Sequence, residues 1–114
     1  MRIVNLTGHR LTLASSNSSE EVELPSVGQA RVRSISRTEG RLRVAGLVIP
    51  VLRIVEQEIV GLPPPEDEVV YIVSGIVASA AKRADVLSPG RMHRNEKTGR
   101  VETAKALVRL ETLE

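Results

Sequence analysis

Between residues 82 and 94 the sequence carries its densest group of charged side chains, and these could recognise an anion. The candidates are Arg83, Asp85, Arg91 and Arg94. Guanidinium groups form paired hydrogen bonds with phosphate and carboxylate oxygens. Asp85 is also close enough in sequence to pair with Arg83 or Arg91, which would make the group an ordinary surface ion-pair cluster. The pattern therefore predicts either an anion or partner site or a solvated cluster.

A second candidate is the junction at Ser74, which follows the apolar run 69–73 and precedes Gly75. A strand that runs into a helix leaves free backbone N–H groups and the positive end of a dipole, where an anion could bind. The sequence has neither G-x-x-x-x-G-K-[ST] nor G-x-G-x-x-G. Ser74 is equally typical of a helix N-cap, so packing of a helix on a sheet is the simpler interpretation.

Catalytic chemistry has few candidates. Ser74 could formally join Asp85 and either His9 or His93 in a hydrolytic triad, but there is no G-x-S-x-G motif. A small enzyme or ligand binder that uses Ser74 with His9, Tyr71 and Arg83 is a further alternative. The chain has no cysteine and two histidines, whereas a metal site needs three or four converging ligands. We assign no catalytic residue, metal or cofactor, and a non-enzymatic protein is favoured.

The segment 31–43 predicts a basic β-hairpin, with its connection at Thr38-Glu39-Gly40. Alternation places its basic side chains on the wet face of a strand pair: Arg31, Arg33, Arg37, Arg41 and Arg43. A two-stranded ribbon of this kind can enter the major groove of a duplex. Tyr71 is the single aromatic residue, so recognition by base stacking is excluded. A solvated charged face is the alternative.

The elements that must position these residues indicate an α+β fold in one domain, residues 1–114. Without Phe or Trp, the core must be Val, Leu, Ile and Ala, which favours strands. We expect a small, mostly antiparallel curled sheet or half-barrel, closed by one main helix at about 75–84. Pro50 indicates an edge strand or a bulge. The segment 102–113 fits a strand or a helix, with the strand favoured.

Composition and charge also bear on where the protein acts. The net charge is +2, from 16 basic and 14 acidic residues, and the two signs occupy different segments. The first residues turn polar before a secretory signal can form, and no apolar run approaches membrane-spanning length. We therefore expect a cytoplasmic protein that does not enter a membrane. Frequent Arg with few Asn, Gln and Met residues is compatible with a thermophilic source.

Several ordered motifs resemble a group of small proteins encoded by bacteriophages and bacterial genomes. The pattern runs Asn-Leu-Thr-x-His, Gly-Leu-Pro-x-Pro, Tyr-Ile-Val-Ser, Arg-x-Asp-Val, Pro-Gly and Gly-Arg. Its matches here are Asn5, Leu6, Thr7 and His9; Gly61, Leu62, Pro63 and Pro65; Tyr71, Ile72, Val73, Ser74, Val77 and Ala78; Arg83, Asp85 and Val86; Pro89 and Gly90; Gly99 and Arg100. The resemblance implies a phage or prophage context and no particular reaction.

Together these features predict a non-enzymatic, phage-type accessory protein that binds a macromolecular partner, such as a host protein that it modulates. We expect Arg83, Arg91 and Arg94 to contribute to the contact with a protein partner. The alternative is a duplex nucleic-acid-binding protein that uses the hairpin at 31–43. A homodimer formed through strand edges or faces is compatible with either interpretation.

Overall fold

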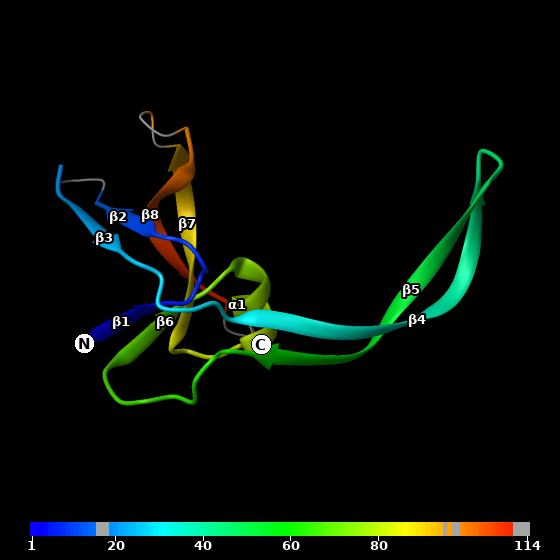
Figure 1. Cartoon of the computed structure of the whole chain (residues 1–114), viewed down its shortest axis with the longest axis horizontal. Coiled ribbons are helices and arrows are strands. Elements are labelled where there is room, and N and C mark those ends of the chain that lie inside the picture. The colour runs from blue at the N-terminus through cyan, green and yellow to red at the C-terminus, as the bar shows by residue number, and fades with distance from the viewer. Residues whose placement is uncertain (16–18, 95, 97–98, 111–114) are drawn as a thin grey trace.

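The structure is a computed structural model that describes residues 1–15, 19–94, 96 and 99–110. The described residues form a barrel-like body and a long two-stranded arm that projects from it (Figure 1). The elements are β1 Arg2–Asn5, β2 Leu11–Ala14, β3 Glu21–Leu24, β4 Arg31–Val44, β5 Leu47–Val60, β6 Val69–Ile72, α1 Gly75–Ala81, β7 Val86–Arg94 and β8 Val101–Arg109.

The body is a six-stranded, nearly closed sheet in the order β1-β6-β7-β8-β2-β3. Its pairings β1–β6, β6–β7 and β2–β8 are parallel, whereas β7–β8 and β2–β3 are antiparallel. Strands make up 61% of the structure and helix 7%. The expected α+β class is therefore wrong: the protein is mostly β, and its body sheet is mixed, with parallel as well as antiparallel pairs.

The helix is shorter than the predicted 75–84, and it does not close the sheet. It connects the parallel strands β6 and β7, which need a crossover because a tight turn cannot join parallel neighbours. Ser74 caps its start by accepting a hydrogen bond from the Val77 N–H, as predicted. Lys82 ends it after seven residues in a left-handed conformation, φ 51°. Arg83 therefore lies beyond the helix.

The core is aliphatic, as the composition predicts, and it lies on both sides of β6. Tyr71 and Val73 pack on one side with residues of β1, α1 and β7, whereas Ile72 packs on the other side with Leu11 and Ala104. The alternation of β6 explains this division, because successive side chains of a strand point to opposite faces. The base of the arm joins the first cluster through Val32 and Ile59.

The arm, residues 31–60, consists of β4 and β5 paired antiparallel over their whole length. Its turn is Ala45-Gly46, where both residues have positive φ (49° and 83°), as a two-residue type I′ hairpin turn requires. The predicted turn at Thr38-Glu39-Gly40 is wrong. Gly40 has no positive φ, and these residues lie inside β4 at a bulge, where Thr38 pairs with Leu52 and Gly40 with Val51. The hairpin thus spans 31–60 and not 31–43.

At the C-terminal end, residues Val101–Arg109 form the strand β8, which confirms the prediction of a strand instead of a helix. It pairs antiparallel with β7 and parallel with β2. The rest of the segment 102–113, residues 111–113, lies outside the described residues, as do Lys97 and Thr98 in the connection between β7 and β8.

Candidate functional site

The arm carries the largest set of exposed aliphatic side chains in the described part of the chain. Their exposed fractions lie between 37% and 65%, for Ile35, Leu42, Val44, Leu47, Val48, Ile49, Val51, Leu52, Ile54 and Val55. Monomeric soluble proteins expose such groups singly, and larger patches mark interaction sites. Sequence reasoning missed this surface, although the run "LVIPVLRIV" between a Gly and a Glu was its visible signal.

The strand register sorts the distal arm into two faces. Leu42 pairs with Ile49 and Val44 with Leu47, and these pairs alternate with Arg41–Pro50 and Arg43–Val48. Cross-strand partners share a face and successive pairs alternate. Aliphatic pairs therefore point one way at the tip, and the pairs that contain arginine point the other way.

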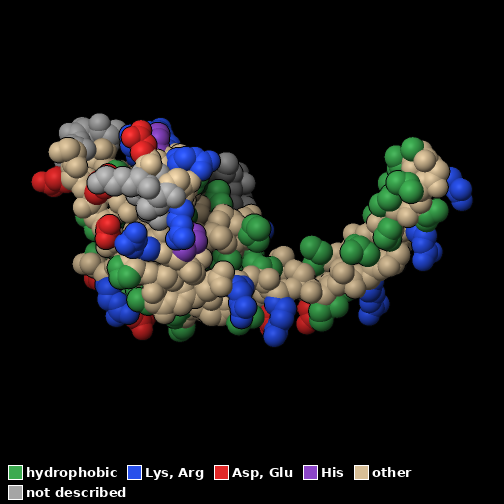
Figure 2. All heavy atoms as spheres, turned by 45° about the horizontal axis from the view of Figure 1, so that its top comes forward, with side chains coloured by type: hydrophobic (Ala, Val, Ile, Leu, Met, Phe, Trp, Pro, Cys, Tyr) green, Lys and Arg blue, Asp and Glu red, His purple; other side chains and the backbone are tan. Residues whose placement is uncertain are grey.

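Beyond the bulge the two sides exchange, because Glu39 is an extra residue on β4, whereas Val51 and Leu52 are consecutive on β5 and point to opposite sides. There Leu52 pairs with Thr38 and Ile54 with Ser36, whereas Arg37 faces Arg53 directly across the two strands. Figure 2 shows that most apolar side chains follow the inner, upper side of the arm and that arginine side chains project from its lower side. We call the five aliphatic residues that share one side of the tip the apolar face (Leu42, Val44, Leu47, Ile49, Val51). The distal arm also carries four arginines (Arg37, Arg41, Arg43, Arg53).

The arm is strongly cationic away from the body. Residues 36–55 contain four arginines and one glutamate, a net charge of +3. The directly opposed pair Arg37–Arg53 is unfavourable for the isolated ribbon, because like charges across a strand pair repel. At the base, Arg33 forms an ion pair with Glu58, and Arg31 pairs in register with Val60. The five arginines predicted for nucleic-acid contact are therefore all on β4, but Arg33 already has a carboxylate partner.

Arg83 and Asp85 form a two-pronged ion pair. Arg83 Nε lies 2.9 Å from Asp85 Oδ1, and Nη2 lies 2.6 Å from Oδ2. Nη1 donates to the Pro63 carbonyl at 3.0 Å, and the guanidinium carbon lies 5.9 Å from the centre of the Tyr71 ring. The hydrogen bonds from Arg83 lower the pKa of Asp85, and the same bonds raise the pKa of Arg83.

This arrangement ties the Pro-rich segment to the body. The Tyr71 ring is buried, at 3% exposure, and its hydroxyl donates to the Pro64 carbonyl at 3.4 Å. The predicted pairing of Asp85 with Arg83 is confirmed, as is the burial of Tyr71 with its hydroxyl at the rim. Each nitrogen of the Arg83 guanidinium has an acceptor within the chain, so this geometry assigns Arg83 and Asp85 to a structural clamp.

Arg91 and Arg94 lie toward the far end of β7 from this clamp. Arg94 is the last residue of β7 and Val86 the first, so a strand of nine residues separates Arg94 from the clamp. Both side chains are exposed, and Arg94 Nη1 donates to the Gly99 carbonyl. The charged group that looked dense in the sequence is therefore divided between the two ends of one strand.

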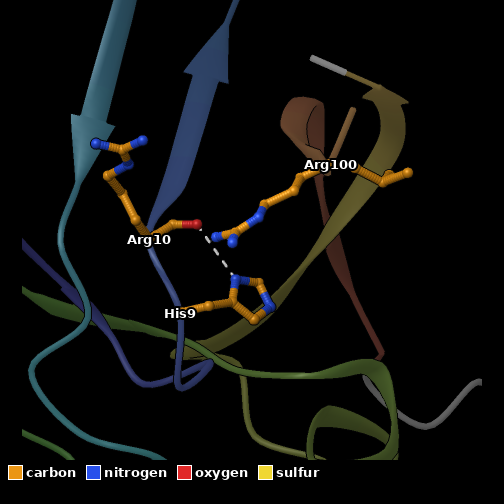
Figure 3. Close-up of a pocket in the computed structure, with 4 residues that line it drawn as sticks. His9, Arg10 and Arg100 are labelled. Carbon is orange, nitrogen blue, oxygen red and sulfur yellow. Dashed lines mark hydrogen bonds between the residues drawn. The ribbon is translucent and has the colours of Figure 1, made fainter. Parts of the chain in front are cut away.

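His9 lies at the bend between β1 and β2, in a pocket of about 540 Å³ that Arg10, Arg100 and Val101 also line. Figure 3 shows the Arg100 side chain pointing into this pocket and the Arg10 side chain turned away from it. Arg10 Nη1 lies 3.9 Å from Glu23 Oε2. The His9 ring binds the Arg10 carbonyl through Nδ1 at 3.2 Å.

The motif Asn-Leu-Thr-x-His has a structural explanation at this bend. The buried Asn5 donates from Nδ2 to the carbonyls of His9 (3.0 Å) and Leu24 (2.8 Å). Its Oδ1 accepts from the Thr7 N–H at 3.0 Å. Asn5 therefore holds the β1–β2 bend against the end of β3, where the sheet nearly closes.

The remaining candidates use their polar atoms locally. Ser74 Oγ caps α1, His9 Nδ1 binds a neighbouring carbonyl, and the Tyr71 hydroxyl binds Pro64. Among the described residues no group of three or more His, Asp or Glu side chains could hold a metal ion. In the same part of the chain, no helix is both long and apolar enough to cross a bilayer.

Comparison with known proteins identifies no family: no family model matches the chain, and searches of curated proteins and of solved structures give no significant match.

Proposed function

We propose that this is a non-enzymatic binding protein and that its arm, residues 31–60, is the element that docks on a protein partner. The observation that carries the proposal is the exposure of ten aliphatic side chains on a ribbon that, within the described part of the chain, packs on the body near its base. An isolated two-stranded hairpin is marginally stable in water. Packing against a partner supplies the missing apolar contacts.

The chemistry of the apolar face favours a protein over a nucleic acid. Leu42, Val44, Leu47 and Ile49 sit in cross-strand pairs without a charged group between them. Buried aliphatic side chains are the centre of protein interfaces, with cationic and polar groups at the rim. Nucleic acid offers mainly phosphate oxygens, which such a face cannot bind.

Duplex nucleic-acid binding is the second candidate, and the four arginines of the distal arm favour it. Arg37 and Arg53 oppose each other, and Arg41 and Arg43 follow toward the tip. Phosphate oxygens would relieve the repulsion between Arg37 and Arg53. In this alternative, affinity falls steeply with salt concentration and depends on the arginines, whereas the apolar face contributes little.

The cellular context of the protein is part of the same proposal. The resemblance to phage-encoded proteins supports a cytoplasmic accessory role in which the partner is a host protein that is modulated. Arg91 and Arg94 remain candidate contributors because both are exposed. Arg83 is a weaker candidate, since Asp85 and Pro63 occupy its guanidinium.

The test is affinity capture from a host-cell lysate with four tagged baits. These are the wild type, Leu42→Asp with Ile49→Asp, Arg41→Glu with Arg43→Glu, and Arg91→Glu with Arg94→Glu. We expect the wild type to capture a protein partner. Its recovery should fall at least tenfold with Leu42→Asp and Ile49→Asp, and it should not change when the lysate is treated with nuclease. Equal recovery of the partner by all four baits would show that the arm does not bind it.

A titration with duplex nucleic acid at two salt concentrations distinguishes duplex binding from protein docking. Salt-sensitive binding that Arg41→Glu with Arg43→Glu abolishes and Leu42→Asp with Ile49→Asp preserves would replace protein docking by duplex binding. We expect no measurable duplex binding by the wild type at low salt.

A further inference from the structure

The arm is a sheet of two strands, so in the described part of the chain both β4 and β5 are edge strands. Every residue from 33 to 58 is exposed, and Figure 1 shows the distal arm projecting away from the body. An exposed edge strand presents backbone N–H and C=O groups with which a further strand can pair. The arm therefore offers strand edges as well as side chains to a partner.

Pro50 shows which backbone groups of the tip point outward. Directly opposed residues of an antiparallel pair exchange either two hydrogen bonds or none, and the two kinds alternate along the strands. Pro50 is opposite Arg41 and has no N–H, so this pair exchanges none. The pair Arg43–Val48, two residues along, is of the same kind. The N–H and C=O groups of Arg41 and Arg43 therefore point away from β5, toward the free edge of β4.

The two edges of the tip are not equivalent. On β5 the residues with outward backbone groups are Val48 and Pro50, and Pro50 supplies no donor. On β4 they are Arg41 and Arg43, and each supplies a donor and an acceptor. Proline on an edge strand opposes the addition of another strand. The outer edge of β4 is therefore the one that can accept a strand.

We propose that β4 pairs at this edge, in the antiparallel direction, with an extended segment of a partner protein in which acidic and aliphatic residues alternate. The inference rests on the proposed function, because it names the kind of segment that docks on the same arm. Strand addition to a sheet edge is a recurring mode of peptide recognition. Main-chain hydrogen bonds supply its affinity, and alternate side chains supply its specificity.

The side chains of the tip determine the chemistry of the segment. Directly opposed residues of neighbouring strands place their side chains on the same face. A carboxylate opposite Arg41 or Arg43 therefore lies beside a guanidinium group, and opposite charges across strands stabilise the pairing. Aliphatic residues opposite Leu42 and Val44, which are 59% and 55% exposed, extend the apolar face. The net charge of +3 on residues 36–55 also attracts an acidic segment at longer range.

A second copy of the chain fits this edge poorly. In that copy the outward backbone groups at the same edge again belong to Arg41 and Arg43, so antiparallel pairing of two β4 tips would set arginine opposite arginine. The edge strand β3, Glu21–Leu24, does alternate acidic and aliphatic residues, but it is four residues long. Its Glu23 carboxylate also lies 3.9 Å from the guanidinium of Arg10. A different protein is therefore the expected source of the segment.

A short fluorescent peptide of alternating glutamate and valine tests the pairing directly. In the proposed geometry the glutamate N–H groups face β4 and the valine N–H groups point away. We therefore expect saturable binding, measured by fluorescence anisotropy, that N-methylation of a central glutamate weakens at least tenfold and N-methylation of a central valine preserves. The two modified peptides have the same composition and charge. Equal binding of the two, or no binding of the unmodified peptide, would overturn the proposal.

Two substitutions at one position make the matching test on the protein. Arg43→Pro and Arg43→Val both remove the charge, but only proline also removes the outward N–H. Since the pair Arg43–Val48 exchanges no hydrogen bond, proline is compatible with the hairpin, as Pro50 is on β5. We expect Arg43→Pro to bind the glutamate peptide at least fivefold more weakly than Arg43→Val, with circular dichroism spectra that agree. Equal affinities would overturn the assignment of this edge.

A charge exchange tests the acidic character of the segment. Arg41→Glu with Arg43→Glu should bind the glutamate peptide at least tenfold more weakly than the wild type does. The same variant should gain affinity for a peptide in which lysine replaces glutamate. Unchanged affinity for the glutamate peptide would show that the arginines do not select the segment.

Failure of this proposal is distinguishable from failure of the proposed function. If no peptide binds but the wild type captures a host protein that Leu42→Asp with Ile49→Asp loses, docking through the apolar face stands and strand addition is wrong. If no peptide binds and the arm variants change no capture, both proposals are wrong. Sedimentation velocity without peptide supplies the last outcome. A mass that rises above 12.4 kDa with concentration, and that Arg41→Glu with Arg43→Glu holds at the monomer value, would make a second copy the occupant and overturn the proposal.

Discussion

Leu42 and Ile49 are direct partners across the two strands of the arm, yet 59% and 44% of their surfaces are exposed. Cross-strand pairing brings the two side chains together, but none of the described residues of the body covers them. The base of the same ribbon differs, because Val32 and Ile59 pack against the core. The arm is therefore anchored at one end and presents its distal aliphatic pairs to solvent, which is the basis of the docking proposal.

The uncovered position of this pair predicts that truncating it has little effect on the stability of the monomer. Leu42→Ser with Ile49→Ser should change the free energy of unfolding by less than about 0.5 kcal/mol in dilute solution. Leu11→Ala, at a position with 0% exposure, should lower it by about 2–5 kcal/mol. Urea unfolding at concentrations where the chain is monomeric measures both. Comparable losses would mean that the arm packs on the body.

Gly61 is predicted to be intolerant of any side chain. Its φ is +86°, and a Cβ at this position would lie 2.7 Å from the Gln29 carbonyl oxygen. Gly61→Ala should therefore lower the free energy of unfolding by about 2 kcal/mol or more, from backbone strain and the clash together. Gly40→Ala is the matched control, because no atom lies within 4 Å of its Cβ. Equal thermal midpoints for the two variants would refute this explanation of Gly61.

The clamp between Arg83 and Asp85 predicts a specific pH dependence. The hydrogen bonds from Arg83 lower the pKa of Asp85 in the folded state, so the contribution of the pair is fully present above the unfolded pKa of about 3.9. It is lost as the pH falls through the lower, folded-state pKa. At pH 7 Asp85→Asn should cost about 1–3 kcal/mol, and this difference from the wild type should shrink below about pH 4.

Urea unfolding of the wild type and Asp85→Asn at a series of pH values measures that difference. Asp67→Asn, which changes an exposed carboxylate in the Pro-rich segment, is the control and should follow the wild-type curve. A difference for Asp85→Asn that stays constant down to acid pH would show that the charge of Asp85 plays no part.

Asn5 predicts a large effect from a small chemical change. Its Nδ2 donates to the carbonyls of His9 and Leu24, and the side chain is buried, at 2% exposure. Asn5→Asp replaces the donor by an oxygen that faces two carbonyl oxygens, which should cost about 2–4 kcal/mol at pH 7. Gln57→Glu makes the same change at an exposed position and should be nearly neutral. Similar thermal midpoints for the two variants would mean that Asn5 does not hold the bend.

The sequence predicted local features wherever a residue type has a short-range physical cause. The Ser74 cap, the buried Tyr71 strand, the Arg83–Asp85 pair and the terminal strand are of this kind. The fold class was wrong because it depends on pairings between distant segments. No local pattern shows that β2 lies parallel to β8, and these pairings make the sheet mixed and nearly closed.

The arm was predicted only in part, and the reason lies in two glycines. Gly40 follows Thr38-Glu39 in a composition typical of a turn, whereas Gly46 follows Ala45, which is an uncommon residue at positive φ. Choosing Gly40 gave a short hairpin and left residues 44–55 as separate strand. The structure instead continues the hairpin through these residues and exposes their aliphatic side chains.

Amide hydrogen exchange tests the central claim most directly, by comparing the free protein with its complex with the captured protein partner. In the monomer we expect residues 40–51 to exchange quickly and the buried strand β6 slowly, because the distal arm has no packing partner. On complex formation, exchange in residues 40–51 should slow at least tenfold while β6 stays unchanged. Exchange in the arm that is equally fast in the free and bound protein would contradict the account.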